Sequence, residues 1–126
     1  MAIVSVGTDL VQIERLGEAL ERRGERFLRR VFTDGERAYC EARNRPQTHY
    51  AGRFAVKEAV MKVLGTGWSG GVRWVDIEVE RPENQAPAVV LHGETARIAE
   101  EKGIRRVWIS ITHDGGLAMA VAIAEG

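Results

Sequence analysis

The stretch Gly52–Gly67, GRFAVKEAVMKVLGTG, decides how the rest of the chain is arranged. Ala, Lys, Glu, Met and Leu are good helix formers, so this stretch predicts a helix. Apolar side chains recur at positions i, i+3, i+4 and i+7, at Val56, Ala59, Val60 and Val63. Gly65 stands where a left-handed residue would end the helix. We therefore expect a central helix that packs through one apolar stripe.

The opposite side of this helix carries Arg53, Lys57, Glu58 and Lys62. One carboxylate among three cations suits a magnesium-phosphate site, which needs a hard oxygen ligand beside positive charge. Glu58 and Lys62 are also an i, i+4 pair in the favourable order, which stabilises an ordinary exposed helix face. From this helix alone, the surface pair is the simpler interpretation.

The composition indicates one small domain spanning residues 1–126. The chain is 44% hydrophobic and 29% charged, which allows a core of modest size. Its 18 basic and 18 acidic residues cancel, so net charge does not indicate a nucleic-acid partner. No apolar run reaches membrane-spanning length. The single cysteine, Cys40, excludes an intrachain disulfide and fits a reducing cytoplasm.

The N-terminal segment predicts a buried strand over Ala2–Asp9, with β-branched residues along it and Asp9 at its end. Two interpretations of Asp9 are open. Aspartate is a favoured N-cap for a following helix, and a carboxylate at a sheet edge can also be a metal ligand. A lone aspartate in this position is more often a cap.

A helical region follows over Gln12–Val31, with a break expected at Gly24. Four arginines are spaced by seven, four and three residues and would share one face of an unbroken helix: Arg15, Arg22, Arg26 and Arg29. Arginine prefers carboxylate and phosphate partners, which makes an acidic protein surface a candidate partner. Pairing with the glutamates of the same segment is an equally good interpretation: Glu14, Glu18, Glu21 and Glu25.

Thr33 and Glu36 form the pattern of a capping box, which predicts a helix continuing to Arg43. The segment Asn44–Thr48 contains Pro46 and is expected to be a loop before the central helix. After that helix, the glycine-rich loop Gly65–Gly71 could let backbone amides approach a phosphate. It is equally well a plain turn.

The C-terminal half predicts mostly strands. They are expected at Val75–Glu80, Pro87–Leu91, Val107–Thr112 and Leu117–Ala124, with turns at Pro82–Gln85 and Asp114–Gly116 and a helix over Glu94–Lys102. His113 stands at the end of the third of these strands, a place where histidine more often serves as a surface residue than as a catalyst. Strand, helices and then mostly strands indicate an α+β domain.

Three segments now stand together in a specific order: Val6-Gly7-Thr8-Asp9, Gly52–Ala59 and Ser110-Ile111-Thr112-His113. In combination they resemble the holo-[acyl-carrier-protein] synthases, the short-chain class of 4'-phosphopantetheinyl transferases. The first segment is similar to the family's Gly-x-Asp motif. The second is similar to its Phe-(Ser/Cys/Ala)-x-Lys-Glu-Ala motif, followed by Lys62 and the turn Gly65–Gly67. The resemblance covers essentially the whole chain.

The resemblance implies the 4'-phosphopantetheinyl transferase fold, with a mainly antiparallel sheet, in a homotrimer whose active sites lie between protomers. It also implies a reaction of fatty acid biosynthesis. The 4'-phosphopantetheine of coenzyme A moves to a serine of apo-acyl carrier protein, and adenosine 3',5'-bisphosphate is released. The nucleophile belongs to the carrier protein. We weigh two alternatives, a non-catalytic carrier-binding scaffold and a Mg²⁺-dependent nucleotide hydrolase.

From the same resemblance we expect Asp9 and Glu58 to be Mg²⁺ ligands and, with Lys62, the catalytic residues. The expected coenzyme A-binding residues are Arg53, Lys62, Gly65, Thr66, Gly67 and His113. Lys57 is expected to form a supporting ion pair or a contact at the rim. The expected carrier-docking residues on the first helical region are Arg15, Arg22, Arg26, Phe27 and Arg30.

Overall fold

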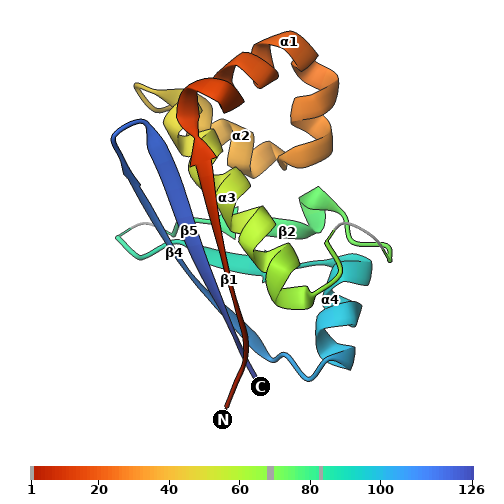
Figure 1. The fold of residues 1–126 in the computed structure, drawn as a ribbon. Coiled ribbons are helices and arrows are strands. Elements are labelled where there is room, and N and C mark those ends of the chain that lie inside the picture. Colours follow the sequence, from red (N-terminus) through yellow and green to blue (C-terminus); the bar gives the residue numbers. More distant parts are fainter. Residues whose placement is uncertain (1, 68–69, 83) are drawn as a thin grey trace.

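In the computed structural model the chain folds around one long helix, α3 (Figure 1). The structure describes residues 2–67, 70–82 and 84–126. Trp68 and Ser69 of the predicted glycine-rich loop and Glu83 of a predicted turn lie outside the described residues. The elements are β1 (Ile3–Gln12), α1 (Ile13–Val31), α2 (Asp34–Glu41), α3 (Pro46–Leu64), the 3-10 turn η1 (Trp74–Asp76), β2 (Ile77–Glu80), β3 (Ala88–Leu91), α4 (Gly93–Glu101), β4 (Arg106–Asp114) and β5 (Leu117–Glu125).

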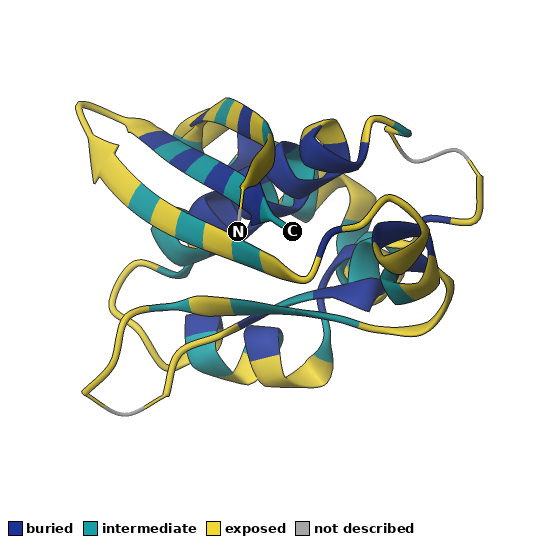
Figure 2. Cartoon of the chain, turned by 90° about the horizontal axis from the view of Figure 1, so that it is seen from below, coloured by how far each residue is buried: buried dark blue, intermediate teal, exposed yellow. Residues whose placement is uncertain are grey.

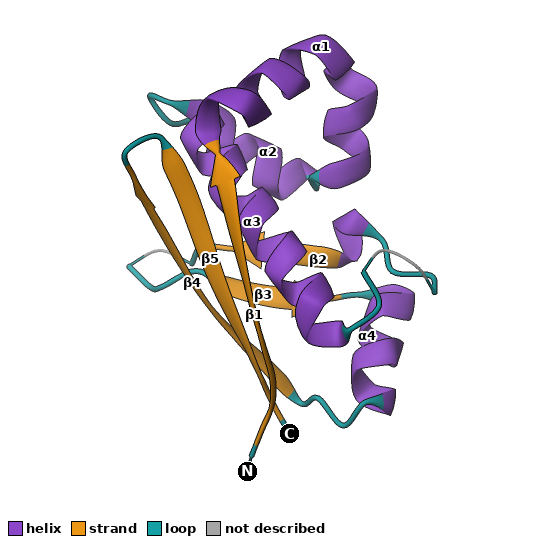
Figure 3. Cartoon of the chain, viewed as in Figure 1, coloured by secondary structure: helices purple, strands orange, loops and turns teal. Residues whose placement is uncertain are grey.

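The strands form an antiparallel sheet in the order β1-β5-β4 and a separate hairpin of β2 and β3. Helices α1 and α2 lie at one end of α3, and α4 lies at the other end (Figure 3). The two chain ends meet near α4, where the Gly126 amide donates a 3.0 Å hydrogen bond to the Ala2 carbonyl. The predicted α+β class with a mainly antiparallel sheet is confirmed. None of the helices in the described residues combines the length and apolarity needed to cross a bilayer.

Small residues let α3 lie directly on the three-stranded sheet. On β5 every second residue is a buried alanine: Ala118, Ala120, Ala122 and Ala124. On β1, a Cβ atom added to Gly7 would stand 2.3 Å from the Ala59 carbonyl oxygen, a separation no side chain tolerates. Glycine is therefore required at this crossing, and β1 rests on the backbone of α3.

The central helix differs from its prediction in two ways. It begins at Pro46, inside the segment expected to be a loop, because proline suits the first turn of a helix. It is also buried nearly all round, as a helix at the centre of a fold must be. Arg53 and Lys57 are buried and do not belong to an exposed face. The predicted left-handed end at Gly65 is confirmed, with φ 75° and ψ 10°.

Local signals in the first half of the chain have mixed outcomes. The capping box is confirmed: the Glu36 amide donates to Thr33 Oγ1 at 3.1 Å, and the Thr33 amide donates to Glu36 Oε1 at 2.8 Å. The break at Gly24 is confirmed by its φ of 73°. The interpretation of Asp9 as an N-cap is wrong, because β1 continues past it and Gln12 is the residue before α1.

In the second half, two strand boundaries differ from the prediction by two residues, and the others differ by at most one. Residues 74–76 form η1, so β2 begins only at Ile77. Strand β4 runs to Asp114, which places His113 within the strand and not beyond it. Figure 2 shows the alternation of buried and less buried residues as bands along the sheet strands. One face of this sheet covers α3, and the other face is open to solvent.

Candidate active site

Asp9, Glu58 and Lys62 come together where β1 crosses α3. Lys62 Nζ donates a 2.7 Å hydrogen bond to the Thr8 carbonyl and lies 3.3 Å from Asp9 Oδ1. Glu58 lies one helical turn before Lys62, and its carboxyl group interacts with the charge of Asp9. Among the described residues, the ion pair of Lys62 is with Asp9 of β1. The interpretation of Glu58 and Lys62 as a simple surface pair along the helix therefore does not describe Lys62. The structure thus brings together the three residues predicted as catalytic.

The electrostatics of this group leave room for a further positive charge. Partial burial raises the pKa of Glu58 above its usual value, the neighbouring Asp9 charge raises it further, and Lys62 opposes the shift. A divalent cation bound by two carboxylates relieves the repulsion between them. Magnesium commonly takes one or two carboxylates and fills its remaining positions with water and phosphate oxygens. No cluster of three or more His, Cys, Asp or Glu side chains exists within the described residues. The chain therefore offers Mg²⁺ two carboxylates, a set that fits.

A second charged group surrounds Tyr39 of α2. The guanidinium carbons of Arg43 and Arg53 lie 3.8 Å and 3.9 Å from the centre of the Tyr39 ring. Arg53 is only 4% exposed, and its Nε has no hydrogen-bond partner within the described part of the chain. A buried guanidinium with an unused donor, next to another cation, is suited to an anionic ligand.

Two histidines extend this second group. His49 lies edge-on to Tyr39, with ring centres 5.8 Å apart. Burial lowers the pKa of His49, and the nearby cations, among them Arg53, Arg43 and His113, lower it further. His113, predicted to bind coenzyme A, therefore belongs with Arg53. Sequence reasoning missed Arg43 and His49; the i, i+4 spacing of His49 and Arg53 was an available signal, and Arg43 had none.

Helix α3 separates the two groups. Strands β1 and β4 lie on either side of β5, about 10 Å apart at the usual strand spacing. Asp9 stands opposite Ala120 of β5, whereas His113 stands opposite Ala118 from the other side. On the helix, Arg53 and Glu58 are five residues apart, which turns them about 140° from each other. A single chain therefore does not gather the predicted coenzyme A residues into a single pocket.

The predicted residues Gly65, Thr66 and Gly67 lie at the C-terminal end of α3, next to the turn that carries Lys62. Gly65 and Gly67 both have positive φ, 75° and 57°, which accounts for glycine at these places. The Thr66 hydroxyl donates a 3.0 Å hydrogen bond to the Gly67 carbonyl. Gly65 is twelve residues beyond Arg53, about 18 Å along the helix. This turn therefore belongs with the Asp9, Glu58 and Lys62 group.

Lys57 forms an ion pair but no contact at the rim. Its ammonium lies 2.9 Å from Glu36 Oε1, and neither side chain is exposed. Burial lowers the pKa of Lys57, and the Glu36 carboxylate opposes that shift. Phe54, on the same helix, stacks on Trp74 with ring centres 5.1 Å apart. Both residues of the motif serve the packing of α3.

Helix α1 carries the predicted carrier-docking residues, but not on one continuous face. Gly24 divides it into two segments that Figure 1 shows at a sharp angle, so the arginines do not share one face as they would in an unbroken helix. The arginines predicted to dock the carrier are exposed and form no ion pair within the described residues: Arg15, Arg22, Arg26 and Arg30. Glu25 pairs at 2.6 Å with Arg37 of α2. Pairing of these arginines with glutamates of their own helix therefore has no support. Phe27 is half-buried, with Arg23 5.2 Å from its ring centre.

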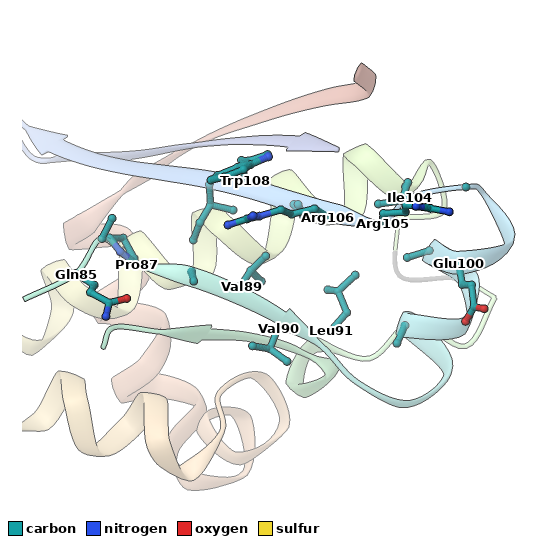
Figure 4. Close-up of a pocket in the computed structure, with 17 residues that line it drawn as sticks. Gln85, Pro87, Val89, Val90, Leu91, Glu100, Ile104, Arg105, Arg106 and Trp108 are labelled. Carbon is teal, nitrogen blue, oxygen red and sulfur yellow. The ribbon is translucent and has the colours of Figure 1, made fainter. Parts of the chain in front are cut away.

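Two clefts of the described surface lie apart from the carboxylates. One, of about 1070 Å³, lies between β3, β4 and α4, with Val89, Leu91 and Ile104 inside and Arg106 and Trp108 along its edge (Figure 4). It contains none of the predicted site residues. The other, of about 760 Å³, lies between α1, the start of α3 and the β4–β5 turn and includes His113. Neither of these clefts includes the Asp9, Glu58 and Lys62 group.

These features define a class of protein. The family model of the 4'-phosphopantetheinyl transferase superfamily matches residues 5–122, and the chain belongs to that superfamily. Within it the chain is similar to proteins named holo-[acyl-carrier-protein] synthase. The protein from Solibacter usitatus (strain Ellin6076) is 46% identical over 123 residues, which cover 98% of each chain. The protein from Anaeromyxobacter dehalogenans (strain 2CP-1 / ATCC BAA-258) is 49% identical over 127 residues, covering 98% of this chain and 97% of the relative.

Solved structures agree. The crystal structure of holo-[acyl-carrier-protein] synthase from Neisseria meningitidis superposes with a TM-score of 0.90 at 30% identity and covers 99% of this chain and 100% of its own. The Helicobacter pylori synthase in complex with coenzyme A gives a TM-score of 0.84 at 29% identity, covering 96% and 100%. The family resemblance and the fold inferred from the three motifs are confirmed.

Proposed function

We infer that the chain transfers the 4'-phosphopantetheine group of coenzyme A to a serine of apo-acyl carrier protein, giving holo-acyl carrier protein and adenosine 3',5'-bisphosphate. The observation that carries this conclusion is the meeting of Asp9, Glu58 and Lys62 at the β1–α3 crossing, in a chain whose relatives are holo-[acyl-carrier-protein] synthases. A non-catalytic scaffold would have no use for this carboxylate pair. A nucleotide hydrolase would have no use for a basic, carrier-docking helix.

We propose that Asp9 and Glu58 hold Mg²⁺ and that Lys62 contacts the pyrophosphate of coenzyme A. When bound, Mg²⁺ would neutralise negative charge on the leaving phosphate. Lys62 already lies against Asp9, so it is placed to meet the same phosphate oxygens as a compact point charge. The raised pKa of Glu58 means that its ionised form gains more than usual from a nearby cation.

We propose that the Arg53 and His113 group binds the 3'-phosphate side of coenzyme A, with Arg43 and His49 contributing charge. Gly65, Thr66 and Gly67 would line the nucleotide beside Lys62. Because α3 keeps these two groups apart within one chain, a single coenzyme A molecule can reach both only if another copy supplies one of them. The separation supports a homotrimer whose active sites lie between protomers.

The open face of the three-stranded sheet supports the same assembly. Its register lines up apolar side chains from all three strands, among them Val6 opposite Ile123 and Ile123 opposite Trp108. Val6, Leu10 and Trp108 are 57%, 60% and 47% exposed, an unusual display of large apolar residues on one sheet face. We propose that this face is buried between protomers, which would give a small domain a larger shared core.

We propose that the exposed arginines of α1 dock the acidic surface of the carrier protein. Surface charge of this kind accelerates encounter and makes association sensitive to salt.

The only cysteine, Cys40, is buried, and burial raises the pKa of its thiol to about 12, so it has no evident reactive role. The chain is suited to the reducing cytoplasm, where we expect the reaction to serve fatty acid biosynthesis.

The mass of the carrier protein tests this function. Apo-acyl carrier protein is incubated with the protein, coenzyme A and Mg²⁺, and its mass is measured. We expect a gain of one phosphopantetheine group, on the serine, with equimolar adenosine 3',5'-bisphosphate. Breakdown of coenzyme A without a gain in carrier mass would indicate a hydrolase. Carrier binding without any change in coenzyme A would indicate a scaffold.

A further inference from the structure

A fully buried ion pair joins the segment next to Glu58 to two other elements. Lys57 Nζ contacts Glu36 Oε1 at 2.9 Å and donates to the carbonyls of Trp74 and Ile77 at 2.9 Å and 2.5 Å. An ammonium group has three protons, and these three acceptors use all of them. The side chains of Lys57 and Glu36 are both 0% exposed. All three ammonium protons of Lys57 are thus used inside the protein.

Both carboxylate oxygens of Glu36 are also paired inside the protein. Its Oε1 accepts from the Thr33 amide at 2.8 Å as well as from Lys57, and its Oε2 accepts from the Val79 amide at 2.8 Å. One carboxylate therefore connects the start of α2, the middle of α3 and strand β2. A buried network in which every member is paired fixes a single arrangement of the elements that it connects.

The position of Lys57 in the chain links this network to the carboxylates. Glu58 is the next residue, about 100° further round the same helix, on the side that faces β1. On its other side, α3 is restrained by the contact of its Ala59 backbone with Gly7 of β1. Gly7 lies two residues before Asp9 on that strand. The rotation and height of α3 at Glu58 are therefore set on one side by Lys57 and on the other by the strand that carries Asp9.

We propose that Lys57 and Glu36 are positioning residues: their buried ion pair holds α3 so that the Glu58 carboxylate stays beside Asp9, and Lys57 itself does not bind coenzyme A. This inference rests on the proposed function for the role of Glu58. If Lys57 turned outward to a phosphate, Glu36 would remain as an unpaired charge in the core, a strongly unfavourable arrangement. The exposed Lys62 needs no such rearrangement to reach a phosphate.

The first test uses Glu36→Asp, which keeps the charge but shortens the side chain, with Glu80→Asp at the exposed end of β2 as its matched control. Four quantities are measured: melting temperature, its rise on adding Mg²⁺, kcat, and KM for coenzyme A. For Glu36→Asp we expect kcat to fall about ten- to a hundredfold, because small displacements of reacting groups have effects of this size. The Mg²⁺-induced rise should shrink, and KM for coenzyme A should stay within about twofold. Glu80→Asp should behave as wild type.

A lower melting temperature with unchanged kcat and an unchanged Mg²⁺-induced rise would overturn the proposal, since the pair would then serve stability alone. If the wild-type protein transfers no phosphopantetheine, the proposed function fails. The Mg²⁺-induced rise would still test whether Glu36 positions the carboxylates.

The second test compares Lys57→Met with the double variant Lys57→Met, Glu36→Gln. A positioning pair predicts that the double variant regains both melting temperature and kcat relative to Lys57→Met, because no buried charge is left without its partner. Lys62→Met is the contrast: it should raise KM for coenzyme A, and Glu36→Gln should not relieve that effect. If Lys57→Met does not fold, the double variant is compared directly with wild type. A folded double variant with a tenfold higher KM for coenzyme A would overturn the proposal.

Discussion

The backbone of Gly7 lies against the carbonyl of Ala59 so closely that a Cβ atom on residue 7 would stand 2.3 Å from the carbonyl oxygen. This contact sets how near β1 approaches α3. Asp9 is two residues further along the strand on the same face, and Glu58 is the helix residue just before Ala59. The glycine of the Gly-x-Asp motif therefore has a geometric purpose: it allows the two carboxylates to share one site.

The first prediction concerns Gly7→Ala. Overpacking of a tight contact destabilises a protein by about 1–3 kcal/mol, so the melting temperature should fall by several degrees. Activity should fall further than stability explains, because the strand is displaced beside Asp9. The matched control is Gly35→Ala in α2, where an added Cβ would meet its nearest atom at 3.6 Å, an ordinary contact. If Gly7→Ala has the same melting temperature and the same turnover as Gly35→Ala, the contact does not position the carboxylates.

A second prediction concerns the carboxylates themselves. Asp9→Ala and Glu58→Ala should each abolish transfer in proteins that remain folded, and chelation should do the same reversibly. Glu58→Gln offers a sharper form. Because burial and Asp9 disfavour the ionised carboxylate, removing the charge should raise the melting temperature at neutral pH while activity is lost. Near-normal turnover of Glu58→Ala in Mg²⁺ would contradict the assignment.

The raised pKa of Glu58 also predicts how Mg²⁺ binding depends on pH. The folded protein binds the Glu58 proton more tightly than an unfolded chain does, so the stability conferred by the protonated group is present at low pH and lost as pH rises through the raised pKa. Mg²⁺ competes with that proton. Its apparent affinity, measured by its effect on the melting temperature, should therefore weaken as pH falls toward the raised pKa, and Glu58→Gln should remove this dependence. An affinity that is flat across that range in the wild type would count against Glu58 as a ligand.

Another prediction concerns docking of the carrier protein. Arg15→Glu or Arg26→Glu should raise KM for carrier protein, by up to about tenfold at low salt, and leave KM for coenzyme A nearly unchanged. Added salt should raise the wild-type KM for carrier protein in the same way and change the KM of the variants less, because screening acts over about 8 Å at physiological ionic strength. Lys102→Glu, at the end of α4, makes the same charge change far from α1 and is the control. A lower melting temperature with an unchanged carrier KM would reject the docking role.

The open sheet face gives a prediction about assembly. Val6→Asp places a charge among apolar neighbours from β5 and β4, so it should dissociate the trimer and abolish transfer while the protomer keeps its secondary structure. Sedimentation gives the mass and circular dichroism the secondary structure. Ala38→Asp on the exposed side of α2 is the control. A stable, active monomer, of the variant or of the wild type, would contradict the proposed assembly.

Local patterns in the sequence predicted most of the elements, because caps and glycines act within a few residues. The capping box at Thr33, the break at Gly24 and the end at Gly65 are of this kind. The burial of α3 was not predicted well, because it depends on contacts from every side. Lys57 looks like a surface lysine in a helical pattern, and only its distant partner Glu36 explains its burial.

The candidate site divides in the same way. Asp9 and Glu58 were found through motifs, although 49 residues separate them in the chain, and the fold brings them together. The Tyr39 group, with Arg43 and His49, was missed because Tyr39 and Arg43 come from α2 and the turn after it, and only the fold brings them to His49 and Arg53 of α3. That Arg53 and His113 lie on the other side of α3 from Glu58 could not be deduced without the strand order.

The most direct test of the account is complementation between two inactive proteins. Glu58→Ala and Arg53→Ala chains, each with its own affinity tag, are co-expressed, and mixed trimers are purified through both tags. If each site takes Glu58 from one copy and Arg53 from its neighbour, every mixed trimer contains one intact site among its three, which gives about a third of wild-type activity. Each variant alone should form trimers and remain inactive. Mixed trimers with no transfer of phosphopantetheine to the carrier, at a mass that proves mixing, would contradict a site shared between protomers.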